Sequence, residues 1–266
     1  MIGFIVPLKA NTGAESWLIE CRNLENTLKS ICNQQSNRFK VFVVYTDYPE
    51  LQYKNAAIQF HKFPHKFLSS ETVAKMEQRL NPGFLHHISD KVYDHGKRLL
   101  YGSNIAMEAG CNFVMPVDAD DFVSNKIAGW VEKYSDEKYG WYVNKGYILN
   151  GQSKILIKVA CNMYQVNGST HIIHTSLLPK ENLSEAAPSA VCFFSSHGYL
   201  RERIRQQSGA ILTPIPFYSV IYYAHSVNWS AIGKTLQSDW IRTIGKYLLR
   251  GVWFSKKLKS EFGLNG

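Results

Sequence analysis

The sequence contains little cysteine, and none of it at a short metal-binding spacing. Its five cysteines, among 266 residues, are odd in number and widely separated. A disulfide scaffold pairs an even set of cysteines, and a structural zinc site needs closely spaced Cys or His ligands, so the pattern argues against both. We expect the thiols to be reduced and buried in the core of a cytoplasmic protein.

The sequence also lacks a long apolar run and an N-terminal leader. The longest apolar stretch, residues 210–224, is interrupted by Pro214 and Pro216 and is too short to cross a bilayer as a helix. The chain opens directly on a strand-like run at residues 2–6, without a basic and apolar segment before it. We therefore expect neither a transmembrane helix nor a signal peptide.

The composition is globular and the net charge is basic. Hydrophobic residues make up 45% of the chain, and 30 Lys and Arg against 21 Asp and Glu give a net charge of +9. The length favours one large domain with an appendage, and no sequence period indicates a repeat protein. The positive charge favours anionic partners, which include nucleotides, nucleic acid and anionic lipid.

Apolar periodicity predicts an α/β fold. Runs at residues 2–6 and 40–45 are typical of buried parallel strands, and residues 17–32 between them carry the apolar stripe of an amphipathic helix. Together they form a βαβ unit. Further strands are expected at residues 57–63, 112–117, 141–149 and 154–160, and further helices at residues 96–110 and 199–207.

Three acidic residues, Asp118, Asp120 and Asp121, follow the strand predicted at residues 112–117. Ligands of open α/β sheets bind at the carboxyl ends of strands, which is where this cluster is expected. Two carboxylates in an Asp-Ala-Asp sequence suit Mg²⁺ or Mn²⁺, ions that also bind phosphate oxygens. The alternative is a solvated acidic turn that caps a following helix.

These segments, in their order, resemble the GT-A-fold glycosyltransferases, particularly the family 2 type, over residues 2–228. The matching pieces are the opening strand closed by Pro7, the helix ENTLKS running into Gln34-Gln35, VFVVYTD, GKRLLYGSNIAMEAG and VMPVDADD with its DXD motif. The resemblance implies a Rossmann-like, mostly parallel central sheet flanked by helices. It divides the domain into a nucleotide-sugar half, residues 1–121, and an acceptor half, residues 122–228.

The activity implied by the resemblance is transfer of a sugar from a nucleoside-diphosphate donor to a hydroxyl of a saccharide or lipid-linked acceptor, with Mn²⁺ or Mg²⁺. Asp118 and Asp120 would hold the metal, and Asp121 would be a helix cap or a supporting group. The residues expected against the donor are Pro7, Thr46, Asp47, Lys97, Asp118, Ala119 and Asp120. Lys97 fits the Lys…Asn pattern of the family better than Arg98 does.

The general base of the family is usually a carboxylate before a helix in the second half. His197 stands at that place here, and a histidine can accept a proton near neutral pH because its ordinary pKa is ~6.5. The alternative is a capping or core histidine, and Glu202 is a weaker candidate base. His225 would be a third metal ligand, while His171 and His174 could line the acceptor cleft.

Residues 240–259 combine apolar residues at helical steps with clustered Lys and Arg, and we predict a basic amphipathic helix within residues 229–266. Such a helix either contacts an anionic membrane surface, here the inner surface, or packs on its own domain.

Two other functions compete with glycosyl transfer. A sugar-1-phosphate nucleotidyltransferase usually has an arginine in a glycine-rich loop after the first strand, and residues 9–13 contain none. A basic polyanion-binding module would make the acidic turn structural, but no nucleic-acid motif supports that reading.

Overall fold

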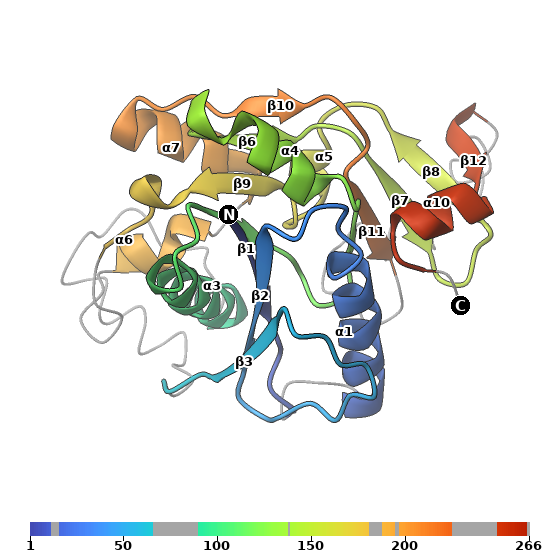
Figure 1. The fold of residues 1–266 in the computed structure, drawn as a ribbon, viewed down its shortest axis with the longest axis horizontal. Helices are drawn as coiled ribbons and strands as arrows, with labels where there is room; N and C mark the ends of the chain where they lie inside the picture. The colour runs from blue at the N-terminus through green and yellow to red at the C-terminus, as the bar shows by residue number, and fades with distance from the viewer. Residues whose placement is uncertain are drawn as a thin grey trace.

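The computed structural model describes residues 1–11, 16–65, 90–137, 139–180, 188–194, 197–224 and 249–264. Within these residues the chain folds into two β-sheets with helices packed around them (Figure 1). The helices are α1 (Trp17–Ile31), α3 (Asp90–Glu108), α4 (Ile127–Tyr134), α5 (Met163–Val166), α6 (Pro188–Val191), α7 (Leu200–Ser208) and α10 (Lys256–Glu261).

The larger sheet has seven strands in the order β10-β6-β9-β4-β1-β2-β3. Their bounds are β1 Ile2–Pro7, β2 Phe39–Tyr45, β3 Ile58–Lys62, β4 Phe113–Pro116, β6 Gly140–Val143, β9 His171–His174 and β10 Thr213–Ile215. Strands β3, β2, β1 and β4 run parallel, whereas β9 is antiparallel to both β4 and β6. The α/β class and the βαβ unit predicted from the sequence are present.

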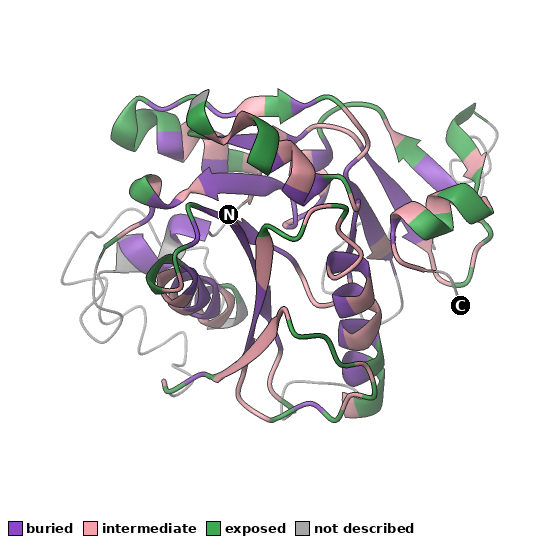
Figure 2. Cartoon of the chain, in the orientation of Figure 1, coloured by how far each residue is buried: buried purple, intermediate pink, exposed green. Residues whose placement is uncertain are grey.

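Alternating side chains of the parallel strands bury two opposite faces of this sheet, because successive residues of a strand point to opposite sides. Phe4 and Val6 of β1 pack in a core with Leu24 and Leu28 of α1. Ile5, between them, packs in a second core with residues of α3. Helices α1 and α3 accordingly cover opposite faces, and β1 is buried along its whole length (Figures 1 and 2).

Helix α3 approaches the sheet closely at Gly102, as expected for its face of small residues. A β-carbon at this position would lie 2.5 Å from Ile5 Cγ2 and 2.9 Å from Val44 Cγ2. The absence of a side chain therefore lets α3 lie directly on β1 and β2. This contact fixes the N-terminal turns of α3 beside the carboxyl ends of those strands.

A second, five-stranded sheet was not foreseen from the sequence. Its order is β12-β8-β7-β11-β5, with bounds β5 Phe122–Val123, β7 Gly146–Asn150, β8 Ile155–Val159, β11 Val220–Ala224 and β12 Gly251–Trp253. The single strand predicted at residues 141–149 was wrong: Asn144 and Lys145 separate β6, in the first sheet, from β7, in the second. A continuous apolar run hides such a change of sheet because both strands are buried.

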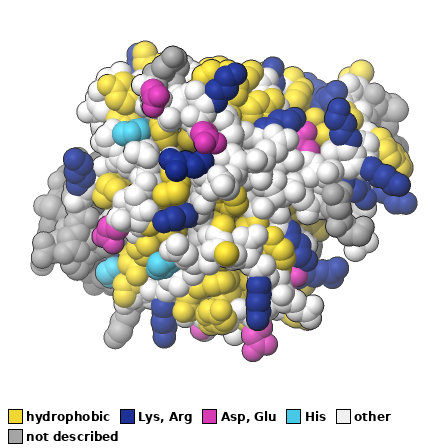
Figure 3. Space-filling model, in the orientation of Figure 1, with side chains coloured by type: hydrophobic (Ala, Val, Ile, Leu, Met, Phe, Trp, Pro, Cys, Tyr) yellow, Lys and Arg dark blue, Asp and Glu magenta, His cyan; other side chains and the backbone are white. Residues whose placement is uncertain are grey.

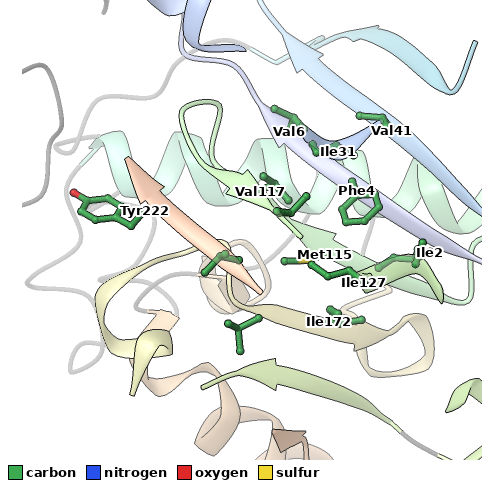
Figure 4. Close-up of a cluster of buried hydrophobic side chains, with 14 of the residues drawn as sticks. Ile2, Phe4, Val6, Ile31, Val41, Met115, Val117, Ile127, Ile172 and Tyr222 are labelled. Carbon is green, nitrogen blue, oxygen red and sulfur yellow. The ribbon is translucent and has the colours of Figure 1, made fainter. Parts of the chain in front are cut away.

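One core connects the two sheets. Ile2, Phe4 and Val6 of β1 lie in the same cluster as Met115 and Val117 around β4, Ile172 of β9 and Tyr222 of β11 (Figure 4). The halves before and after Asp121 therefore share their interior. This shared interior holds the end of β4 in a fixed position relative to β9 and β11.

The predicted C-terminal helix is wrong over Gly251–Trp253, which forms strand β12 on the edge of β8. Glycine is unfavourable within a helix, and Val and Trp suit a strand. The short α10 that follows packs on the first half of the domain. Asn33 Nδ2 donates to the carbonyl of Ser260 at 2.7 Å, and Phe262 is completely buried. The remaining part of the predicted helix, residues 240–248, lies outside the described residues.

Four of the cysteines, Cys21, Cys32, Cys111 and Cys161, are free. Cys21 and Cys111 are buried and Cys32 is half-buried, but Cys161 is exposed and is not a core thiol. No helix among the residues covered by the structure is both long enough and apolar enough to traverse a membrane.

Candidate functional site

The Asp-Ala-Asp-Asp sequence lies just beyond the carboxyl end of β4, in the middle of the larger sheet. Val117, which precedes it, donates its N–H to the carbonyl of Ile5 at 2.8 Å. Asp118 and Asp120 are half-buried, whereas Asp121 is only 1% exposed. The strand therefore presents the first and third residues of the sequence at its end and buries the fourth.

Asp121 braces this turn from inside the protein. Its carboxylate accepts a hydrogen bond from Ser169 Oγ at 2.5 Å and another from the Tyr223 N–H at 3.4 Å. Ser169 Oγ in turn accepts the N–H of Asp118 at 2.8 Å. Burial, together with repulsion from Asp120 and Asp118, raises the pKa of Asp121 well above its usual range. Asp121 is therefore a supporting group, and its predicted role as a helix cap was wrong because strand β5 follows it.

His95 of α3 contacts the first carboxylate. Its Nε2 lies 3.0 Å from Asp118 Oδ1, and both side chains are partly exposed. Burial alone would raise the pKa of Asp118, but the hydrogen bond and charge of His95 and the charge of His197 hold it below its ordinary value. Asp118 is thus ionised at neutral pH.

Gly168, just before β9, lies close to the other oxygen of the Asp118 carboxylate. A β-carbon there would lie 2.9 Å from Asp118 Oδ2, so only glycine leaves the carboxylate its space. Sequence reasoning missed both His95 and Gly168. His95 immediately precedes the Gly-Lys pair that was noticed, but nothing in the sequence indicates its distance from Asp118.

Lys97 and Arg98 follow His95 on α3 by two and three residues and are 8% and 4% exposed. Arg98 donates to Asp94 at 2.6 Å and to Thr46 Oγ1 at 2.8 Å, and its guanidinium lies over the ring of Phe63. Its Nη1 is buried without a partner among the described residues. The pKa of Lys97 is lowered by burial, and its ammonium lies 6.0 Å from the centre of the Tyr93 ring. Arg98 therefore links α3 to the end of β2.

The predicted donor residues Pro7, Thr46 and Asp47 meet at the carboxyl ends of β1 and β2. Pro7 is paired with Val44 in the parallel register, one residue before Tyr45 ends β2. Asp47 Oδ2 accepts the N–H of Asn11 at 2.7 Å, which ties the segment after β1 to the end of β2. The structure thus brings these three residues together at the carboxyl ends of neighbouring strands. Strand β4, which leads to Asp118, lies next to β1.

His197 lies in a 3-10 turn immediately before α7 and is half-buried. Its Nδ1 is 2.7 Å from the carbonyl oxygen of Tyr164, and because a carbonyl can only accept, Nδ1 carries the proton. In the neutral ring the lone pair is therefore on Nε2. His197 also interacts electrostatically with Asp118, which brings it into the same region as the acidic residues.

The other candidates differ in their positions. His171 is completely buried in β9, and burial together with the charges of His197 and Arg201 lowers its pKa to about 3. His174 contacts Phe113 and Ser176 near the other end of β9, so it does not join this region. Glu202 is half-buried on α7 and forms an ion pair with Arg205 at 2.8 Å, so its carboxylate is already engaged. His225 lies outside the described residues.

Within the described ranges, no group of three or more His, Cys, Asp or Glu side chains is arranged to hold a metal ion. Asp118 and Asp120 stand half-buried at a strand end and offer two carboxylates to a cation. Mg²⁺ in phosphate-binding sites is commonly held by one or two carboxylates, with substrate oxygens and water completing the shell. These residues fit such an ion.

No protein-family model matches the chain, and no curated protein sequence matches it. Solved structures do match. The S. aureus TarS 1-349 structure has a TM-score of 0.50 at 14% identity, and the same protein in complex with UDP has a TM-score of 0.52 at 14% identity. Each match covers 84% of this chain but 60% of the TarS chain, so this chain spans well under two thirds of that length. The α/β fold with mixed sheets is thus similar to that of TarS.

Proposed function

We propose that this chain is a GT-A-type glycosyltransferase that moves a sugar from a nucleoside-diphosphate donor to a hydroxyl of a saccharide or lipid-linked acceptor. The observation that carries the proposal is the Asp118–Asp120 pair at the end of β4, held by the buried Asp121–Ser169 hydrogen bonds. The fold similarity to TarS, which has been crystallised with UDP, supports a uridine diphosphate donor as the first to test.

The donor would lie across the ends of β1, β2 and β4. Thr46, fixed by Arg98, and Asp47, fixed by Asn11, are suited to hydrogen-bond a base and ribose next to Pro7. Lys97 would neutralise diphosphate charge, and Ala119 leaves room for the donor between the two carboxylates. Pro7 ends β1, Thr46 and Asp47 directly follow β2, and Lys97 is on α3, which packs on the sheet. Binding of the donor would therefore require little reorganisation of these residues.

Asp118 and Asp120 would hold Mn²⁺ or Mg²⁺, with His225 as a further ligand. When bound, such an ion acts as a Lewis acid that stabilises negative charge on a departing diphosphate. The protein's own contribution is to keep Asp118 ionised and to orient the turn that carries both carboxylates. The hydrogen bonds from Ser169 to Asp121 and from the Asp118 N–H to Ser169 provide that orientation.

His197 would be the general base. The Tyr164 carbonyl holds its Nδ1–H, so Nε2 is the atom that accepts the proton of the attacking acceptor hydroxyl. The negative charge of Asp118 stabilises the imidazolium that forms. The acceptor oxygen would then attack the anomeric carbon as the bond to the diphosphate breaks.

The proposal is tested by thermal unfolding of the protein with UDP, with and without Mn²⁺. A ligand that binds only the folded state at a hundred times its Kd adds ~2.7 kcal/mol to the free energy of unfolding, so we expect a clear rise in Tm. We expect the rise to depend on Mn²⁺. A shift of equal size for UDP and for inorganic polyphosphate, without metal dependence, would instead indicate a polyanion-binding module.

We further propose a peripheral membrane contact at the inner surface for this enzyme. The C-terminal basic edge, which we define as Leu249, Arg250, Trp253, Lys256 and Lys257, is exposed, with Leu249 at 86% and Trp253 at 61%. Lys and Arg side chains gather over α10 and its surroundings in the surface view (Figure 3). Exposed apolar side chains beside clustered lysines suit an anionic lipid surface.

Changing Lys256 and Lys257 to Glu should weaken binding to anionic vesicles. Each basic residue near such a surface contributes ~1 kcal/mol, so losing two corresponds to roughly thirtyfold weaker binding, and reversal adds to it. Co-sedimentation with phosphatidylglycerol vesicles at low and high salt measures the effect. Lys54 and Lys62, exposed near the opposite edge of the larger sheet, provide a control of equal charge. An equal loss of vesicle binding in both double variants would show that the C-terminal basic edge makes no specific membrane contact.

A further inference from the structure

Arg201, in the first turn of α7, is held between two tyrosine rings. Its guanidinium carbon lies 3.8 Å from the ring centre of Tyr142 and 4.5 Å from that of Tyr164. The two rings are themselves 5.3 Å apart and nearly perpendicular. Contact with aromatic faces orients a guanidinium but does not engage its N–H donors, which lie in the plane of the group.

Arg201 differs from the two other arginines of α7, each of which has a polar partner. Arg205, on the same helix, is paired with Glu202, and Arg203 donates to the carbonyl of Phe193 at 2.6 Å. Arg201 forms neither an ion pair nor a hydrogen bond with any residue that the structure describes. Its half-buried guanidinium therefore keeps up to five donors for a ligand.

Arg201 and His197 share a contact with Tyr164. The two residues are four apart across the start of α7, and Tyr164 contacts both: its carbonyl accepts from His197 and its ring lies under Arg201. His197 and Arg201 also both act electrostatically on buried His171 in β9. Arg201 and His197 therefore lie in one neighbourhood, around Tyr164 and the start of α7.

We infer that Arg201 is a specificity-determining residue that binds an anionic group, a carboxylate or a phosphate, on the acceptor. The inference rests on the proposed function, since it takes His197 as the group that meets the acceptor hydroxyl. A planar guanidinium matches both anions by two parallel hydrogen bonds. The rings of Tyr142 and Tyr164 pre-orient the guanidinium, and Tyr164 also binds His197, so the anion and the reacting hydroxyl would belong to the same acceptor.

Binding of three defined probes to the full chain tests the inference: maltotriose, trigalacturonate and maltotriose carrying one phosphate monoester. Calorimetric titrations are done with and without UDP. We expect both anionic probes to bind at least about tenfold more tightly than maltotriose, which corresponds to one charge-assisted contact. Comparison of trigalacturonate with the phosphate ester distinguishes the two sources of negative charge.

Three variants distinguish a specific role of Arg201 from an effect of net charge and from an effect on folding. Arg201→Gln should abolish the preference for anionic probes, and Arg201→Lys should restore only part of it, because an ammonium lacks the bidentate geometry. Arg205→Gln, an equal charge change on the same helix, should leave the preference intact. No preference in the wild-type protein, no binding of any probe, or equal loss in the Arg205 variant would overturn the inference. UDP binding in the same samples reports separately on the proposed function.

Discussion

Asp118→Asn is expected to lower the rate of sugar transfer by roughly three orders of magnitude or more while the protein stays folded. An amide is a poorer ligand than a carboxylate for a hard divalent cation, and it cannot stabilise the positive charge of His197. The fold should tolerate the change because Asp118 is partly exposed and its main-chain N–H still donates to Ser169. Transfer from a radiolabelled UDP-sugar and the Tm of the variant measure the two effects.

Asp136→Asn is the matched control for this experiment. Asp136 is exposed in a 3-10 turn after α4, where it accepts a hydrogen bond from Ser135. Its substitution should change neither rate nor stability. Asp120→Asn should reproduce the loss seen for Asp118→Asn. Full activity in either site variant would show that the Asp-Ala-Asp sequence does not act in the reaction.

His197→Ala is expected to reduce turnover by ~10²–10⁴-fold, the range for loss of a general base, with little change in donor affinity. Initial rates of transfer and the affinity for UDP are the measurements that separate a loss of turnover from a loss of donor binding.

His174→Ala controls for the loss of a histidine from the same domain, since His174 contacts Phe113 and Ser176 and lies outside the site. His197→Asn keeps a side-chain donor for the Tyr164 carbonyl but provides no comparable base. If His197 only positions α7, His197→Asn should retain most of the activity. If it is the base, both His197 variants should be similarly slow.

The α/β class and the position of the acidic cluster after a strand could be predicted from local patterns in the sequence. The apolar runs that became β1, β2 and β4 are fully or largely buried, and burial on both faces of a strand leaves a local apolar signature. The stripe along α1 is likewise a local pattern. Asp118 comes two residues after β4 ends, so its position near a strand end could be predicted without knowing which strands are neighbours.

The tertiary structure alone decided which side chains meet Asp118 and Asp121. His95 and Ser169 are 23 and 48 residues from their partners, on α3 and before β9, and no local pattern encodes those distances. The second sheet and strand β12 escaped prediction for the same reason. Strand pairing joins distant segments, and Gly251–Trp253 became a strand because β8 offered an edge. Periodicity reports how a residue is buried, whereas contacts between segments depend on how the whole chain packs.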